Sequence, residues 1–455
     1  MSPRYHVVGI GGAGMSAIAR LLLARGDVVS GSDRGHWPLA DALARDGARV
    51  ATSFDAANVA GADVVVRSSA YGDANPEVAA ARASGIPVWK REDAWRELAR
   101  GRRVVAVAGT HGKSTTTAMT WAALRGGGID ASLICGAVLR DTGSNAHAGT
   151  SDVLVIEADE YDRAFLSLAP TVAAVLNVEH DHVDVFPTVA DVRDAFAAFA
   201  GRIAPGGALV ACADDPVAAS LADARRKRGQ PTRTYGSVAA AQYRVTAPED
   251  RADGLAFTLA LGSGATVPVV LRVPGMHNAL NAAAAIAAAH ALGTSPAESS
   301  RALASFTGTG RRLETLGEAR GVTVVDDYAH HPSEIRASIA AMRPRARGRL
   351  VVIFQPHTPS RLRAFFDDFA AALRAADDRL VVETFQSARE AADERGGARA
   401  LAERAGALYA PDAEAAARIV AERALPGDLV LVLGAGDIRP AGERALELLR
   451  ERAAV

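Results

Sequence analysis

Cysteine is nearly absent from this chain of 455 residues, which has only Cys135 and Cys212. Two cysteines so far apart cannot build a disulfide framework, and they lack the spacing of a metal site. Long apolar runs are also missing, since none approaches the roughly 20 residues of a membrane span. The start, MSPRYHVVGIGG, lacks the charged region and apolar core of a signal peptide. We therefore expect a cytoplasmic protein that does not enter a membrane.

An excess of one charge is missing as well. The chain has 51 basic and 52 acidic residues, a formal net charge of −1. Proteins that coat nucleic acid or an anionic membrane need a basic excess, so we expect neither partner. Lysine is rare and occurs only at Lys90, Lys113 and Lys227. A lysine at a chemically demanding position is therefore more informative here than in most sequences.

The length suggests three domains of roughly 150 residues each. Short apolar strands alternate with helical stretches, which predicts mostly parallel sheets covered by helices on both faces. Antiparallel strands are expected within 240–275, and an alanine-rich helix from Asn278 to Leu292. The predicted fold is α/β in three domains: a Rossmann-like domain (1–100), a central P-loop ATPase-type domain (101–307) and a C-terminal Rossmann-like domain (308–455).

The segment VVAVAGTHGKSTTTAM has the pattern of a phosphate-binding loop, the P-loop. An apolar strand runs into a glycine turn and a helix, so backbone N–H groups can surround a polyphosphate. Lys113 would neutralise phosphate oxygens, and Ser114 would offer its hydroxyl to Mg²⁺. Val107 replaces the usual first glycine, and a plain strand-to-helix turn is the alternative. The expected ATP-binding residues are Gly109, Thr110, His111, Gly112, Lys113, Ser114 and Thr115.

A second glycine-rich loop, GIGGAG, follows the first predicted strand. Gly9 would permit a tight turn, Gly11 would let a pyrophosphate approach, and Gly14 would allow close helix packing. Asp33 ends the next strand, where a dinucleotide fold places its ribose-binding acid. The motif fits NAD, FAD or any nucleotide with a diphosphate, and tight packing alone is the alternative. Two such loops indicate a nucleotide-bearing substrate together with ATP.

Two acidic clusters follow apolar strands in the central region. The first would face the P-loop, where Mg²⁺ needs a carboxylate. In the second, alternation along an extended segment would place His180 and His182 on one face. Zinc is an alternative, although the phosphate loop favours Mg²⁺, and either cluster can be a solvated loop. The clusters contain Glu157, Asp159, Glu160 and Asp162, then Glu179, His180, Asp181, His182 and Asp184.

Further candidates lie in the last half of the chain. Asn278 is either a helix N-cap or an adenine contact, and Arg311 or Arg312 could reach a transferring phosphate. Two strands, expected to be neighbours, end in VVDDYAHHP and FQPHTPSR, at the edge where open α/β sheets place their sites. Seven of the eleven histidines fall in the turns described so far: His111, His180, His182, His277, His330, His331 and His357.

Together these motifs resemble the Mur ligases over essentially the whole chain. In family order they are GIGGAGMSA, SSA with NPE, GTHGKSTTT, EADE, DHVD, HNALNA, GTGRR, DDYAHHP and FQPH..SR. The resemblance implies an ATP-dependent ligase that forms an amide bond through an acyl phosphate, with Mg²⁺ as cofactor. The resemblance is strongest to the branch of the family that joins L-alanine to the lactyl carboxylate of UDP-N-acetylmuramate in peptidoglycan precursor synthesis. VRDAFAAF has no lysine, in agreement with that branch, because several relatives carry a carbamylated lysine there.

The resemblance also assigns roles to individual residues. The catalytic residues would be Lys113, Arg312, His330 and Arg361, and the metal ligands Ser114, Glu157 and His182. ATP would also contact Asn278, Asn281, Arg312 and Asp327. The UDP-sugar would be bound by Gly11, Gly12, Ala13, Gly14, Met15, Ser16, Asp33, Ser68 and Ser69.

Three alternatives remain open from the sequence. A related ligase would add a tripeptide to the same UDP-sugar, and comparing alanine with tripeptide as acceptor separates the two. An NAD-dependent oxidoreductase would use GIGGAG, although the Lys113 loop argues against it. A nucleotide-binding regulator without catalysis is the third. We expect a monomer or a weak homodimer.

Overall fold

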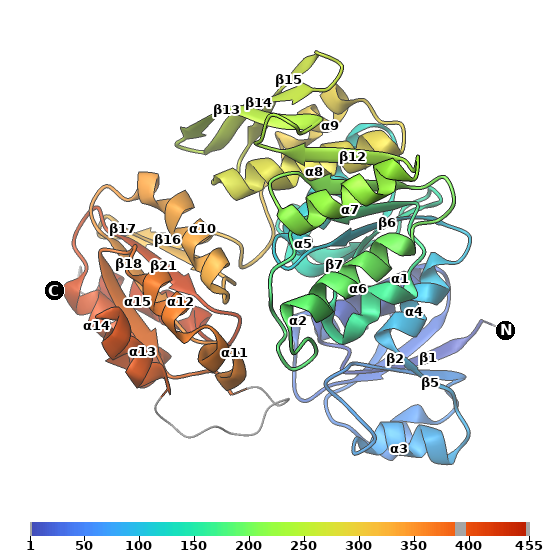
Figure 1. Cartoon of the computed structure of the whole chain (residues 1–455). Helices are drawn as coiled ribbons and strands as arrows, with labels where there is room; N and C mark the ends of the chain where they lie inside the picture. The colour runs from blue at the N-terminus through green and yellow to red at the C-terminus, as the bar shows by residue number, and fades with distance from the viewer. Residues whose placement is uncertain (1, 387–396, 452–455) are drawn as a thin grey trace.

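The computed structural model describes residues 2–386 and 397–451. Three β-sheets follow one another along the chain, and helices cover each of them (Figure 1). The predicted three-domain α/β fold is therefore confirmed. The last sheet and its helices form the body on the left of Figure 1, and the first two domains lie together on the right. Among the described helices, none has both the length and the apolar character needed to cross a membrane.

The first domain has a five-stranded sheet in the order β3-β2-β1-β4-β5, and all its pairs are parallel. Helices cover both faces, so the central strands β1 and β4 are mostly apolar with buried middle residues, whereas the edge strands β3 and β5 are only partly buried. Its elements are β1 (Arg4–Val8), α1 (Ala13–Ala24), β2 (Val28–Ser32), α2 (Pro38–Arg45), β3 (Arg49–Ala51), η1 (Ala56–Val59), β4 (Val64–Arg67), α3 (Pro76–Ala83), β5 (Val88–Lys90) and α4 (Arg91–Ala99).

The second domain has a ten-stranded sheet in the order β15-β14-β13-β12-β11-β10-β6-β9-β7-β8. The strands next to β6 are parallel to it, and β13 to β15 form the antiparallel extension that the sequence predicts. The elements are β6 (Arg103–Ala108), α5 (Lys113–Gly126), β7 (Ser132–Leu139), β8 (Ser144–His147), β9 (Val153–Glu157), η2 (Tyr161–Ser167), β10 (Val172–Val175), α6 (Val189–Gly201), β11 (Ala208–Cys212), α7 (Pro216–Lys227), β12 (Thr232–Gly236), β13 (Tyr243–Arg251), β14 (Gly254–Leu261), β15 (Thr266–Leu271), α8 (Met276–Ala291) and α9 (Pro296–Leu303).

The alanine-rich helix is α8, and it begins two residues before the predicted start. Its N-cap is Gly275, whose φ of 95° is in the left-handed region that favours glycine. The interpretation of Asn278 as the N-cap is therefore wrong. Buried alanines let α8 pack closely against α5, the helix that follows the P-loop.

The third domain has a six-stranded sheet in the order β16-β17-β21-β18-β19-β20. Among the strands described for this domain, only β16 is antiparallel to its neighbour. Because β21 lies between β17 and β18, the expectation that these two strands are neighbours is wrong. The elements are β16 (Glu314–Ala319), β17 (Val322–Asp327), α10 (Pro332–Met342), η3 (Arg343–Arg345), β18 (Leu350–Phe354), α11 (Pro359–Ala364), α12 (Phe366–Leu373), β19 (Asp378–Val382), α13 (Gly397–Ala405), β20 (Leu408–Ala410), α14 (Ala413–Arg423), β21 (Leu429–Leu433) and α15 (Arg439–Glu451).

The hydrophobic cores divide the molecule differently from the sheets. One continuous core spans the first and second domains, where α1 packs against β7 and β8. The third domain has its own core on each face of its sheet. Several of its contacts with the second domain are polar; one example is Arg345 Nη2, which donates to the carbonyl of Gly254 at 2.7 Å. A domain attached in this way can move without opening a core.

We predict that Phe369→Ala destabilises the third domain by about 3–5 kcal/mol. Phe369 is fully buried, with its ring centroid 5.3 Å from that of Phe354, and its removal leaves a cavity. Denaturant unfolding followed by circular dichroism measures the change. The control is Asp368→Ala, an exposed neighbour in the same helix, which should change stability by at most about 0.5 kcal/mol. Equal losses in both variants would contradict this assignment of the core.

Candidate active site

A cavity of about 560 Å³ lies where the three domains meet. The first domain contributes Gly14 and Arg91, the second the P-loop and the carboxylates after β9, and the third residues such as Arg312 and Arg361. We call it the central cavity. Ligands held by different domains can therefore meet in one place.

Two glycines shape the P-loop between β6 and α5. Gly112 has a φ of 80°, and a Cβ there would lie 2.7 Å from Oδ1 of Asn281 on α8. At Gly109 a Cβ would lie 2.8 Å from Leu176 Cβ. Larger residues would therefore displace either the loop or its neighbours. Asn281 lies directly against the loop, as its predicted role in nucleotide binding requires.

Lys113 fills the cradle of the P-loop. Its Nζ donates to the carbonyls of Gly109 (2.7 Å) and Thr110 (3.1 Å) and to Glu160 Oε1 (3.0 Å). Burial would lower the pKa of Lys113, but the carboxylates of Glu160 and Asp159 hold it above its usual value. The ammonium group therefore stays charged, and Glu160 occupies the side on which an anionic ligand would pair with it.

Asn177 is a P-loop partner that the sequence analysis missed. Its carbonyl accepts from Thr110 N (3.0 Å), its Oδ1 accepts from His111 N (2.7 Å), and its Nδ2 donates to the carbonyl of His111 (3.1 Å). These two loop amides are therefore engaged within the protein. A phosphate group at this loop would therefore meet the amides at the start of α5. An asparagine directly after the buried run of β10 was the available signal.

Ser114, in the first turn of α5, lies against Glu157 at the end of β9. Val107 of β6 pairs with Glu157 of β9, so the carboxylate lies beside the P-loop. Ser114 Oγ donates to Glu157 Oε1 at 3.0 Å, and Gly136 N donates to Oε2 at 2.6 Å. A hydroxyl and a carboxylate are ligands that Mg²⁺ prefers, so this pair fits the predicted metal position.

A second group that can hold a cation comprises Asp159, Glu160 and His182, whose ligand atoms lie within 4.8 Å of one another. Burial would raise the pKa of Asp159, but Arg91 and Lys113 lower it to about 2. His182 has a φ of 51° and places Nε2 3.6 Å from Glu160 Oε1. The group therefore combines two carboxyl groups with an imidazole.

His180 does not join His182, so the expectation of a shared face is wrong. His180 Nε2 lies 2.9 Å from the carbonyl oxygen of Phe186. The segment is not a strand, and the left-handed backbone at His182 breaks the alternation on which the expectation depended.

Glu334, on α10, is the main residue that the sequence analysis missed. Its carboxylate lies 3.5 Å from Arg312 Nη1 and 3.3 Å from His111 Nδ1, and it accepts from His330 N at 3.0 Å. Burial would raise its pKa, but His330, His111 and Arg312 hold it well below the usual value. Glu334 stands three residues after the N-cap His331, a position at which a glutamate ordinarily caps its own helix.

Arg361 joins the third domain to the second. Its Nε and Nη2 donate to Asp181 Oδ1 at 2.9 and 2.8 Å, and both side chains are buried. Burial would raise the pKa of Asp181, but Arg361 and His182 hold it far below the usual value. The pair lines the central cavity together with His330 and His357.

Two other predicted ATP contacts serve local structure. Asp327 accepts from Leu313 N (3.0 Å) and Ala329 N (2.7 Å), and burial raises its pKa to about 6 despite Arg312. Asn278 Nδ2 donates to the carbonyl of Pro274 at 2.6 Å. Asp327 therefore fixes the backbone next to Arg312 and Tyr328, and Asn278 fixes the start of α8.

The first glycine loop is arranged differently from the prediction. Gly11 N donates to Asp33 Oδ2 at 2.9 Å, and a Cβ on Gly11 would lie 2.6 Å from Trp37 Cγ. The space above Gly11 is therefore filled by Trp37 and Asp33. At Gly14 the nearest atom to a Cβ is Arg91 Cδ at 3.6 Å, so close packing does not explain this glycine. Gly14 instead lines the central cavity.

The remaining predicted UDP-sugar residues surround this loop. Ser16 Oγ donates to the carbonyl of Ala13 and accepts from Asn145 Nδ2 of the second domain, both at 3.0 Å. Ser68 follows β4 and lies next to Gly9. A Cβ on Gly9 would be 3.2 Å from the Cβ of Ser68. The other residues of this group are Gly12 before α1, Met15 buried within α1, and Ser69 after Ser68.

Comparison with known proteins agrees with this geometry. Family models match the chain in succession: "Mur ligase family, catalytic domain" at 4–103, "Mur ligase middle domain" at 107–289 and "Mur ligase, glutamate ligase domain" at 311–436. The UDP-N-acetylmuramate–L-alanine ligase of Thermobifida fusca is 44% identical over 98% of this chain and 96% of its own length. The protein of that name from Kineococcus radiotolerans is 45% identical over 99% and 97%.

Two solved structures extend the comparison. The UDP-N-acetylmuramate–alanine ligase of Thermotoga maritima has a TM-score of 0.83 at 28% identity, covering 99% of this chain and 100% of that one. A murein peptide ligase of Psychrobacter arcticus has a TM-score of 0.74 at 25% identity, covering 99% of both chains. The fold and the cavity define an ATP-dependent ligase that forms an amide bond. The chain belongs to the Mur ligase family.

We predict that His111 remains protonated at neutral pH. Burial would lower its pKa, but Glu179 and Glu334 raise it from 6.5 to about 9. These ion pairs therefore stabilise the folded protein fully below about pH 6.5, and their contribution is lost as the pH rises through 9. Histidine NMR titration of the metal-free protein measures the pKa.

Glu179→Gln should lower the pKa of His111, whereas burial keeps the pKa of His330 near 3 in both proteins. Titration of His111 near pH 6.5 in the unsubstituted protein would contradict the charge assignment.

Proposed function

We propose that this ligase joins L-alanine to the lactyl carboxylate of UDP-N-acetylmuramate, a step in peptidoglycan precursor synthesis. The observation that carries the proposal is the central cavity, which brings Lys113, the Ser114–Glu157 pair and Arg361 together from two domains. The two relatives described above, 44% and 45% identical over nearly their full lengths, are named for this reaction.

The chemistry requires activation of the carboxylate, because a carboxylate is a poor electrophile. Its oxygen attacks the γ-phosphorus of ATP, the bond to ADP breaks, and an acyl phosphate forms. The amine of alanine then attacks the acyl carbon, and the tetrahedral intermediate collapses with release of phosphate and a proton. The products are the amide, ADP and phosphate.

ATP binding would begin at the P-loop. The amides at the start of α5 and Lys113 would hold the phosphates, and Lys113 would exchange Glu160 for a phosphate oxygen. Asn281, which lies against Gly112, and Asn278 would contact the nucleotide from α8. Arg312, held now by Glu334, would approach the transferring phosphoryl group from the third domain.

Mg²⁺ would be held by Ser114 and Glu157, and a second ion by His182 beside Asp159 and Glu160. The donor sets fit because they are mainly hydroxyl and carboxylate oxygens next to a phosphate loop. Bound there, Mg²⁺ would neutralise charge on the transferring phosphoryl group.

The UDP diphosphate would lie at the loop from Gly11 to Ser16, with Asp33, Ser68 and Ser69 close by. Its approach to Gly11 requires Trp37, which is 48% exposed, to swing away from the loop. Arg361 and His330 would position the carboxylate and the incoming amino acid. The polar attachment of the third domain supports closure on binding, which would keep water from the acyl phosphate.

A tripeptide-adding ligase is the second candidate, and the likeness to the murein peptide ligase favours it. That structure has the lower TM-score of the two described, 0.74 against 0.83. The two functions differ in the acceptor, which only an assay with both acceptors separates.

Phosphate release with ATP, UDP-N-acetylmuramate and a panel of acceptors tests the proposal. We expect release that requires both the UDP-sugar and an amino acid, with L-alanine preferred over serine and glycine. Release with the tripeptide but not with L-alanine would replace the proposal with the second candidate.

Lys113→Ala should lower kcat by at least about 10³-fold, because it removes a charge that stabilises phosphoryl transfer. UDP-sugar affinity, measured by calorimetry, should stay within about twofold because that ligand would bind another domain. The matched control is Lys227→Ala at the exposed end of α7, with activity unchanged. Loss of both activity and UDP-sugar binding in Lys113→Ala would mean that the two loops do not serve separate sites.

A further inference from the structure

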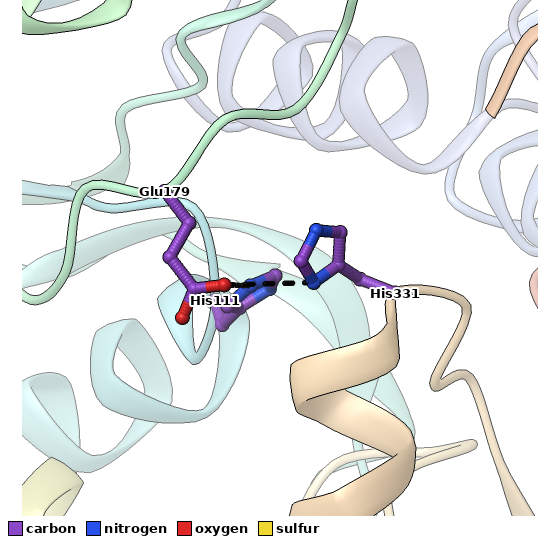
Figure 2. Close-up of side chains that lie close together, drawn as sticks. All are labelled: His111, Glu179 and His331. Carbon is purple, nitrogen blue, oxygen red and sulfur yellow. Dashed lines mark ion pairs between the residues drawn. The ribbon is translucent and has the colours of Figure 1, made fainter. Parts of the chain in front are cut away.

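Two histidines and a glutamate converge outside the central cavity. His111 belongs to the P-loop, Glu179 follows β10, and His331 is the N-cap of α10 in the third domain. None of the three lines the central cavity. Figure 2 shows their side chains pointing toward one another across the junction between the domains.

Two of the three spacings in this trio are close to those of a tetrahedral metal site. Glu179 Oε2 lies 3.5 Å from His111 Nε2 and 3.6 Å from His331 Nδ1, and the ligand atoms all lie within 4.8 Å of one another. Ligands about 2.1 Å from a tetrahedral zinc ion are about 3.4 Å apart. Small adjustments of the side chains would therefore complete the coordination.

The surroundings already orient these side chains. His111 Nδ1 lies 3.3 Å from Glu334, the arrangement in which a carboxylate holds one ring nitrogen and the other binds metal. His111 Nε2 is buried, and apart from its ion pair with Glu179 at 3.5 Å it makes no hydrogen bond among the described residues. Ser333 Oγ donates to Glu179 Oε2 at 2.6 Å. The glutamate side chain is 39% exposed, which leaves room for water as a fourth ligand.

We propose that His111, Glu179 and His331 bind a divalent transition metal ion of the zinc type, which bridges the second and third domains. Two imidazoles and one carboxylate select zinc or cobalt over magnesium, which prefers oxygen ligands. The site is separate from the positions assigned to Mg²⁺ above.

Binding changes two existing interactions. The metal takes the lone pair of His331 Nδ1 that accepts from Ser333 N at 3.3 Å, a long hydrogen bond. It also replaces the proton on His111 Nε2. The bound ion holds α10 against the P-loop, and turnover slows because domain opening needs one ligand to leave.

Cobalt is the probe, because tetrahedral Co²⁺ absorbs visible light strongly. The metal-stripped full-length protein is titrated with Co²⁺ in excess Mg²⁺, which occupies the oxygen-rich positions. We expect one equivalent with a tetrahedral spectrum, displaced by Zn²⁺. A wild-type protein without this spectrum would overturn the proposal.

His331→Asn separates metal binding from helix capping, because asparagine is a good N-cap but a poor zinc ligand. We expect its Co²⁺ affinity to fall by at least about tenfold, with its melting temperature unchanged in the absence of metal. The control, His182→Asn, removes the imidazole of the other group and should keep the spectrum.

If the His331→Asn variant does not fold, Glu179→Gln tests the site by removing a different ligand. Unchanged Co²⁺ affinity in a folded His331→Asn or Glu179→Gln variant would refute the assignment. Loss of the spectrum in His182→Asn would place the ion at the other group and refute it equally.

Discussion

The site depends on charge compensation between elements that are distant in sequence. Lys113 lies against Glu160, Arg312 against Glu334, and Arg361 against Asp181. A buried charge that loses its partner costs several kcal/mol, so each pair constrains where its strands and turns can lie. An anionic substrate can replace the carboxylate without leaving the cation bare. These carboxylates therefore hold the basic groups ready for phosphate and carboxylate ligands.

The same pairs explain how the domains cooperate. Two of the carboxylates, Asp181 and Glu334, belong to networks that cross from the second domain to the third. These polar contacts are strong when the domains are closed. When the domains open, water can replace them, whereas an apolar interface would be exposed to water at a cost. Closure is therefore compatible with repeated opening, which a ligase that must release ADP needs.

The sequence predicts the features that local patterns determine. Apolar runs predict the strands, alanine predicts α8, and glycine with Lys113 predicts the P-loop. Asn177 and Glu334 could not be found in this way, because their partners are distant in sequence and Glu334 resembles an ordinary helix cap. The strand order in the third domain, and the left-handed backbone of His182, likewise depend on tertiary contacts.

The continuous core beneath α1 links the first two sheets, whereas the third sheet has cores of its own. Removal of the second domain would leave the apolar side of α1 open to water, so the first hundred residues are not an independent folding module. The third domain buries its apolar side chains in cores of its own, so it can fold without the other two domains. Recombination between related genes would therefore preserve folding best at a crossover near residue 310, and would be harmful near residue 100.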